Sequence, residues 1–276
     1  MLTRIASFTV AVENLERSIG AYQSALGYVL RRRSVIGLRS AAAWRAPRLQ
    51  GRPWALLSAP TGEPAALRLI EQPRTPGFDA EHSLGWTAIE IAVEDPYALA
   101  ASLANSPFRV VVPPRPLPWD AEFHAMQVLG PDDELLYFTR LPADRIVLDI
   151  RGARCAVDRA FIAVQGCRDV DATLQFYRDQ LGTPTQEGGE TRVQIINDRF
   201  GLPADHRTRL GIVKLPQDFL IEVDAYPAAA VTRVQAAGWL PPGISMVSFE
   251  DDAITAPDLL QGPDGEWLER LPVRPP

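Results

Sequence analysis

One carboxylate interrupts an otherwise apolar segment that has the pattern of a β-strand. Glu90 follows Thr87, Ala88 and Ile89 and is itself followed by Ile91. A charged side chain buried in such a strand is unfavourable unless a partner compensates it. We therefore expect Glu90 either to form a buried ion pair that stabilises the fold, or to exchange protons with a ligand as a general acid or base.

A histidine beside an aspartate is a second acid–base candidate. His206 follows Asp205 and precedes the strand-like segment that leads to Glu222. Asp205 could orient the imidazole, although adjacent residues of an extended chain point in opposite directions. His124 lies near a strand and His82 in a polar linker, positions typical of surface or core histidines. We take His206 as the histidine best placed for catalysis.

The motifs of several large enzyme classes are absent from the sequence. It contains no Gly-x-Ser-x-Gly elbow, no Walker loop, no Gly-x-Gly-x-x-Gly after a strand and no His-Glu-x-x-His. General acid–base chemistry, carried by carboxylates with a tyrosine or histidine, is the chemistry that the remaining residues support without a metal.

Composition limits the class of partner. The 276 residues, 46% hydrophobic and 22% charged, suffice for two globular domains. A net charge of -6 offers no basic field to nucleic acid. No stretch approaches the ~20 apolar residues of a membrane-spanning helix, and the N-terminus alternates like a strand, unlike a signal peptide. Only Cys155 and Cys167 could form a disulfide. We predict a soluble, cytoplasmic protein that binds neither membranes nor nucleic acid.

A strand, a polar cap and an amphipathic helix closed by glycine occur twice in the same order. The two copies are residues 8–27 and 163–182. Asparagine or aspartate before the helix and glycine after it are typical of helix ends. The aligned pairs are Asn14 and Asp169, Tyr22 and Tyr177, Leu26 and Leu181, and Gly27 and Gly182. The pattern indicates a duplicated unit, in which the two tyrosines occupy equivalent positions.

Further copies of this unit extend the pattern to a βαβββ module. Residues 85–103 form a third strand–cap–helix copy, and residues 243–252 begin a fourth. Alternating segments follow each of the first three helices, whereas residues 244–271 contain two strand-like pieces and no clear helix. We predict a first domain over residues 1–141 with two modules, and a second over residues 142–276 whose last module is truncated.

These motifs resemble the vicinal-oxygen-chelate superfamily of glyoxalases, bleomycin-resistance proteins and extradiol dioxygenases. The matching features are a helix that ends in Tyr-x-x-x-Leu-Gly and a later strand preceded by Gly-Pro-Asp-x-Glu, at residues 130–134 and 262–266. The resemblance covers most of the chain. It implies an α+β fold in which modules pair into two open, cup-shaped mixed sheets, with small molecules bound in the cups.

The resemblance also identifies the positions at which this superfamily binds metal. One position lies on each module's first strand, usually His, and one on its last strand, usually Glu. In the first half the corresponding residues are Ser7, Ala88, Arg68 and Tyr137, and in the second half Phe161 or Ile162, Met246, Glu222 and Glu269. Iron and zinc sites normally use imidazole and at least three protein ligands. We therefore predict no metal cofactor, with Glu222 and Glu269 as the remaining metal-ligand candidates.

Alternation along the strands suggests which side chains face a cup. Glu90 shares a face with Ala88, so the first cup would contain Glu90 with Arg68 and Tyr137 as its partners. These side chains would form either a structural ion pair or a polar group that orients a ligand. Large apolar side chains would contact the body of the ligand. The residues predicted to contact it are Ser7, Arg68, Trp119, Met126 and Met246.

Three functions are compatible with these residues. In the first, a glyoxalase- or dioxygenase-like protein binds a small, partly apolar organic molecule and transforms it by metal-independent acid–base chemistry. The predicted catalytic residues are Glu90, Tyr137, His206 and Glu222. In the second, a bleomycin-resistance type of protein binds the molecule without reaction. In the third, a divergent metal-dependent lyase or dioxygenase uses Glu222 and Glu269. We expect a monomer or homodimer.

Overall fold

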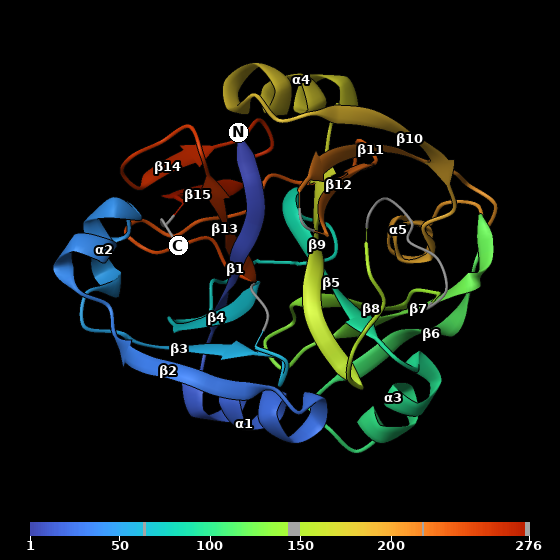
Figure 1. Cartoon of the computed structure of the whole chain (residues 1–276), viewed down its shortest axis with the longest axis horizontal. Helices are drawn as coiled ribbons and strands as arrows, with labels where there is room; N and C mark the ends of the chain where they lie inside the picture. The colour runs from blue at the N-terminus through green and yellow to red at the C-terminus, as the bar shows by residue number, and fades with distance from the viewer. Residues whose placement is uncertain (63–64, 143–149, 217, 274–276) are drawn as a thin grey trace.

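Two curled β-sheets lie side by side, with helices around them (Figure 1). The computed structural model describes residues 1–62, 65–142, 150–216 and 218–273. The helices are α1 (Leu15–Leu26), α2 (Leu38–Ala43), the 3-10 helix η1 (Pro47–Leu49), α3 (Pro96–Leu103), α4 (Val170–Leu181) and α5 (Gln194–Phe200). None of the helices in the described part of the chain is both long and apolar enough to cross a membrane.

The eight-stranded sheet is formed by consecutive strands from the middle of the chain, and the seven-stranded sheet by the strands that precede and follow them. From edge to edge, the seven-stranded sheet contains β14 (Asp258–Gln261), β15 (Trp267–Pro272), β13 (Ile244–Asp251), β1 (Leu2–Val12), β4 (Ala66–Glu71), β3 (Pro53–Ser58) and β2 (Val29–Val35). The eight-stranded sheet contains β10 (Thr185–Thr191), β11 (Thr208–Leu215), β12 (Phe219–Ala225), β9 (Val157–Cys167), β5 (Gly85–Val93), β8 (Leu135–Arg140), β7 (Asp120–Leu129) and β6 (Arg109–Leu117). The α+β fold of paired modules is confirmed.

The modules do not pair in chain order. The first strand of module one, β1, pairs antiparallel with β13 of module four, and β5 of module two pairs with β9 of module three. The predicted pairing of modules one and two in a first cup is therefore wrong. Residue 141 lies between β8 and β9, which belong to the same sheet. Every module presents an equivalent first strand, so the local sequence pattern is compatible with either pairing.

The duplicated strand–cap–helix unit forms as the sequence predicts. The side chains of Asn14 and Asp169 each accept a hydrogen bond from a backbone N–H in the first turn of α1 and α4. Gly27 and Gly182 end these helices with left-handed φ angles of 68° and 59°, a conformation that glycine adopts without steric cost. Module four contains β13, β14 and β15 and, within its described residues, no helix, so its truncation is confirmed.

The two sequence motifs of the resemblance meet at the boundary between the sheets. The Tyr22 hydroxyl on α1 donates a 2.5 Å hydrogen bond to Glu134 Oε1 in the first Gly-Pro-Asp-x-Glu turn. The Tyr177 hydroxyl on α4 reaches Glu266 of the second turn through Gln165, in hydrogen bonds of 2.8 and 2.7 Å. Both tyrosines are fully buried. Each motif pair thus joins a helix of one sheet to a turn of the other.

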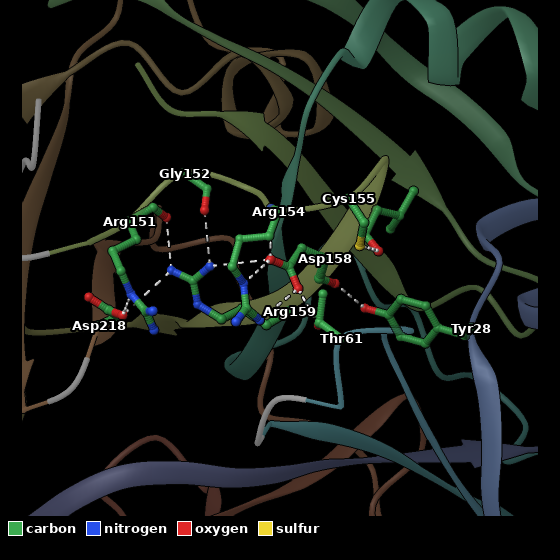
Figure 2. Close-up of polar contacts among 10 residues, drawn as sticks. Tyr28, Thr61, Arg151, Gly152, Arg154, Cys155, Asp158, Arg159 and Asp218 are labelled. Carbon is green, nitrogen blue, oxygen red and sulfur yellow. Dashed lines mark hydrogen bonds and ion pairs between the residues drawn. The ribbon is translucent and has the colours of Figure 1, made fainter. Parts of the chain in front are cut away.

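A buried aspartate at the start of β9 makes a further connection between the sheets (Figure 2). The Asp158 carboxylate accepts hydrogen bonds from Thr61 Oγ1 at 2.7 Å and from the Arg154 backbone N–H at 3.0 Å. Its own carbonyl accepts one from the Tyr28 hydroxyl at 3.0 Å. Burial acts to raise the pKa of Asp158, but these hydrogen bonds hold it below its usual value. Asp158 therefore fixes β9 against the first module.

The neighbouring arginine holds the segment that enters β9. Arg159 Nη2 donates to the carbonyl of Arg151 at 2.8 Å, and Nη1 donates to that of Gly152 at 3.4 Å (Figure 2). Its side chain is almost fully buried, with Asp218 at 4.0 Å. Because Ile150 belongs to the same segment, Arg159 helps to position one wall of the cavity described next.

Candidate functional site

The concave face of the eight-stranded sheet surrounds a cavity of about 460 Å³. This volume suits a small organic molecule. Apolar and aromatic side chains form most of its wall, among them Val112, Leu117, Phe123, Phe161 and Leu220. Trp119 also contacts the cavity and is 55% exposed, which puts it at the mouth. The wall is thus suited to the apolar body of a ligand.

Three neighbouring strands bring two glutamates to the floor of this cavity. Glu90 on β5 is in register with Tyr137 on β8 and with Ile162 on β9. Ile162 is in turn in register with Leu220 on β12, two residues before Glu222. Alternation along β12 puts Leu220 and Glu222 on the same face. Glu90 and Glu222 therefore lie on either side of β9, and both line the cavity.

The carboxyl groups of the floor hold their protons unusually strongly. Burial, and then the charge of Glu222, raise the pKa of Glu90 to about 8. Burial and Glu90 raise the pKa of the fully buried Asp224 to about 7. Burial and Asp224 raise the pKa of Glu222 well above its usual value. Within the described residues, no arginine, lysine or histidine forms an ion pair with any of the three. Glu90 is therefore mostly protonated at neutral pH.

Further buried polar groups of the cavity lack hydrogen-bond partners in the described part of the chain. They include the Tyr137 hydroxyl and Gln127 Oε1. A buried polar atom without a partner costs about 1–3 kcal/mol, so such atoms call for a specific explanation. A polar group of a ligand that reaches the floor would satisfy both.

Charged residues of both signs lie toward the mouth. Arg115 and Arg192 line the cavity there, and Arg115 Nη1 donates a 2.7 Å hydrogen bond to Gln194 Oε1. Glu187 forms an ion pair with Arg209 at 2.8 Å. The mouth is therefore polar and ionic, whereas the floor carries carboxyl groups without a cation.

The corresponding face of the seven-stranded sheet is occupied by an ion pair. Arg68 Nη2 on β4 donates to Glu269 Oε2 at 3.0 Å, to Ser7 Oγ at 2.8 Å and to Ser248 Oγ at 3.0 Å. Trp44 Nε1 donates to Glu269 Oε1 at 2.6 Å. Burial acts to raise the pKa of Glu269, but Arg68, Ser248 and Trp44 hold it below its usual value. Glu269 is therefore an ionised carboxylate with a cation beside it.

Aromatic side chains fill the rest of this face. The segment that contains α2 and η1 packs against it, through a cluster in which Trp44, Trp54 and Trp239 surround Leu49 and Ile70. Trp44 also lies over Arg68, with 5.0 Å between the guanidinium carbon and the ring centre. Protein side chains thus occupy the space that a ligand occupies in an open cup.

Comparison with solved structures identifies the architecture. The chain matches glyoxalase I from Zea mays with a TM-score of 0.63 over 98% of this chain and 92% of that one, at 15% identity or less. It matches a proposed dioxygenase from Bacillus subtilis strain 168 with a TM-score of 0.65 over 99% and 86%, at 10% identity. The chain has the vicinal-oxygen-chelate fold. No protein-family model and no curated sequence matches it, so the similarity concerns the fold alone.

Within this vicinal-oxygen-chelate fold, four of the predicted site residues meet in one cavity. They are Glu90, Tyr137, Glu222 and Trp119. The predicted contact between Arg68 and Glu90 is wrong, because Arg68 lies on the other sheet, in the ion pair with Glu269. Ser7, Arg68, Met246 and Glu269 all belong to that filled sheet, and none of them lines the 460 Å³ cavity.

Two other predicted residues also lie away from the cavity. Met126 is fully buried on the face of β7 opposite to Ala125 and Gln127, which line the cavity. His206 is exposed in the turn before β11, and its carbonyl accepts a hydrogen bond from Asn197 Nδ2 at 3.1 Å. A role for either side chain in this site is therefore not supported.

Four polar residues of the site or its surroundings were not predicted from the sequence. They are Gln127, Asp224, Arg115 and Arg192. Asp224 could have been found, because it lies two residues after Glu222 on the same strand face. Gln127 follows Met126, and adjacent strand residues point to opposite faces. Gln127 would have been found if the odd-numbered residues of β7, and not Met126, had been assigned to the cup. Nothing in the sequence indicated that the two arginines approach one mouth.

The donor set of the cavity does not fit the metal centre of the vicinal-oxygen-chelate superfamily. In residues 1–62, 65–142, 150–216 and 218–273, no group of three or more His, Cys, Asp or Glu side chains could hold a metal ion. Glu222 and Glu269 lie on different sheets and cannot bind one ion together. Burial raises the pKa values of Glu90 and Glu222, and no histidine among the described residues lines the cavity, whereas iron and zinc sites normally use imidazole.

Proposed function

We propose that the eight-stranded cup binds a small, partly apolar organic molecule and transfers protons to and from it through Glu90 and Glu222. One observation carries this proposal. Two cavity-facing carboxyls without an ion pair lie in an apolar cavity with Tyr137, whose hydroxyl has no hydrogen-bond partner in the described residues. Side chains in this state form a poor structural core and a suitable acid–base site.

The geometry suggests a role for each group. The apolar body of the ligand contacts Phe161 and Phe123, and its polar head reaches the floor. The Tyr137 hydroxyl donates a hydrogen bond to an oxygen of the ligand, and so stabilises negative charge that develops there. Glu90 in its carboxylate form accepts a proton from an acidic C–H bond, and protonated Glu222 returns one to another ligand atom. The ligand is isomerised without change of composition, and proton exchange with solvent restores both carboxyls.

The first test is a ligand screen by thermal shift on the wild type and on Ala125→Trp. Ala125 lines the cavity, so the indole would occupy the ligand's space. Compounds that bind in the cup should stabilise the wild type and leave Ala125→Trp unchanged, while circular dichroism shows that the variant is folded. If every hit stabilises both proteins equally, the cup is not the binding site and the proposal fails.

The second test measures proton transfer on the hits themselves. Incubation in D₂O, followed by proton NMR, should show that a carbon-bound proton of the ligand exchanges for deuterium. Glu90→Gln should slow this exchange at least tenfold, because glutamine cannot accept a proton, while the ligand still binds. Glu190→Gln, at the rim of the same cavity, is the matched control and should exchange normally. Binding without exchange in the wild type would contradict catalysis and favour sequestration.

A further inference from the structure

The floor of the open cup contains acidic groups and no cation to match them. We propose that the head group recognised there is an organic cation, a primary or secondary ammonium attached to an apolar body. This inference rests on the proposed function of the cup, and it adds the chemical class of the ligand. It follows from comparing the two sheets, from the charges around the floor and from the hydrogen-bonding capacity of the floor.

In the seven-stranded sheet, the glutamate equivalent to Glu222 is Glu269, and it has a cation as its partner. Glu269 lies on the last strand of module four, and Glu222 lies on the last strand of module three. Arg68 and Tyr137 lie on the last strands of modules one and two, so they too occupy equivalent positions. In the filled sheet the guanidinium of Arg68 lies 3.0 Å from Glu269, beneath the ring of Trp44. In the open cup the neutral phenol of Tyr137 replaces the guanidinium. A ligand cation would supply the charge that Arg68 supplies in the other sheet.

The elements around the floor contribute neutral and acidic side chains to it. β8 contributes Tyr137 and Thr139, and β9 contributes Phe161 and Ile162. On β9 the guanidinium of the buried Arg159 lies 5.9 Å from the ring centre of Phe161, but it donates to the carbonyls of Arg151 and Gly152 and does not line the cavity. β7 contributes Gln127, and β12 carries Asp224 as a further acid. Within the described residues, the arginines of the cavity lining lie toward the mouth on β6 and on the segment before α5. The floor therefore favours a positive group, and the mouth is where a negative group would be tolerated.

The hydrogen-bonding capacity of the floor points in the same direction. An ammonium group carries up to three donors and no acceptor. The floor offers acceptors: the carboxyl oxygens of Glu90 and Glu222, and the buried Gln127 Oε1, which has no partner among the described residues. Tyr137, 7% exposed, also turns an unpartnered hydroxyl oxygen to this space. Its ring can also stabilise the cation through its π face.

Binding of a cation should also change the protonation of the floor. In the free protein the pKa of Glu90 is about 8, so the group is mostly neutral at pH 7. A nearby ammonium favours the carboxylate, so binding at pH 7 should release a proton to the buffer. Affinity should then rise with pH up to about 8, while the amine itself stays protonated. A neutral ligand of the same shape should cause no such release.

The experiment uses three probes with one apolar body: 4-phenylbutylamine, 4-phenylbutanol and 4-phenylbutanoate. Isothermal titration at pH 7, in two buffers with different ionisation enthalpies, gives the affinity and the number of protons released. We expect the amine to bind at least tenfold more tightly than the alcohol, with release of a proton. Glu90→Gln and Glu222→Gln should each weaken amine binding at least tenfold and change alcohol binding less than threefold. Glu190→Gln should change neither.

The outcomes test the cation inference separately from the proposed function of the cup. If the alcohol or the carboxylate binds as tightly as the amine, and Ala125→Trp abolishes that binding, the cup is a binding site but the cation inference is overturned. If none of the three probes binds the wild type at millimolar concentration, both the inference and the proposed cup are contradicted. Amine binding that persists in Glu90→Gln and Glu222→Gln also overturns the inference.

Discussion

Replacing Glu90 by glutamine should make the protein more stable at neutral pH, although the residue is a proposed catalytic group. Glutamine has nearly the shape of the protonated glutamic acid and never ionises. In the wild type, unfolding lets Glu90 release a proton that the folded cup retains. Ionisation of the unfolded chain therefore favours unfolding at neutral pH, and the substitution removes this effect.

The size of the effect follows from the two pKa values. The pKa of Glu90 is about 8 in the folded protein, against an ordinary value of 4.5. Its contribution to stability is fully present below pH 4.5 and is lost as the pH rises toward 8, because the unfolded chain binds fewer protons in that range. The loss is about 1.4 kcal/mol per pH unit. From pH 5 to pH 7 it amounts to about 2.5 kcal/mol, since the unfolded group is already partly ionised at pH 5.

Urea denaturation at pH 5, 6 and 7 measures this directly. The stability of Glu90→Gln relative to the wild type should increase by about 2.5 kcal/mol between pH 5 and pH 7. Glu266→Gln is the matched control, because the pKa of Glu266 is also raised to about 8. Glu266 accepts hydrogen bonds from Gln165 and from the Asp264 backbone, so glutamine should destabilise the protein at pH 5. A Glu90→Gln variant that is about 3–5 kcal/mol less stable than the wild type at pH 7 would refute the reasoning, since it would reveal a buried cation paired with Glu90.

Three other predictions concern the rest of the molecule. Tyr177→Ala should lower the free energy of unfolding by about 3–5 kcal/mol, because the side chain is fully buried, and a loss under 1 kcal/mol in urea denaturation would contradict this. Arg68→Met leaves the buried Glu269 unpaired and should cost about 3–5 kcal/mol without changing amine binding in the open cup; a neutral effect on stability would contradict it. Protein purified without added metal should contain less than one equivalent of iron, zinc, manganese or nickel by elemental analysis, whereas a stoichiometric metal lost in Glu222→Gln would contradict the donor-set argument.

Local features of the fold were predictable because short-range interactions determine them. The caps at Asn14 and Asp169, the glycine helix ends and the buried tyrosines all depend on residues within a few positions of one another. The truncated last module was visible for the same reason. Residues 38–43 and 194–200 form short helices that were not predicted, and each is too short to show a clear periodicity.

The composition of the site was harder to predict because it depends on the pairing of modules. Glu90, Tyr137 and Glu222 were identified by their residue types on apolar strands, and they line one cavity. Arg68 was assigned to the same cup because consecutive modules were assumed to pair. It lies instead in the sheet that β1 and β13 share. Contacts between residues far apart in the sequence determine which first strands pair with each other. A local sequence pattern carries no information about these contacts.

The order of the strands has a consequence for how the chain is assembled. All strands of the eight-stranded sheet lie between Gly85 and Ala225, whereas the seven-stranded sheet needs β1 at one end of the chain and β13 to β15 at the other. During synthesis at ~5–20 residues per second, β1 would wait roughly 10 to 50 s for Ile244 of β13 to follow it. Until then one edge of β1 is unpaired and open to association with other chains. The eight-stranded sheet can thus fold as a continuous insert while its neighbour is still incomplete, so the latter half of translation is the stage at which this protein is most exposed to aggregation.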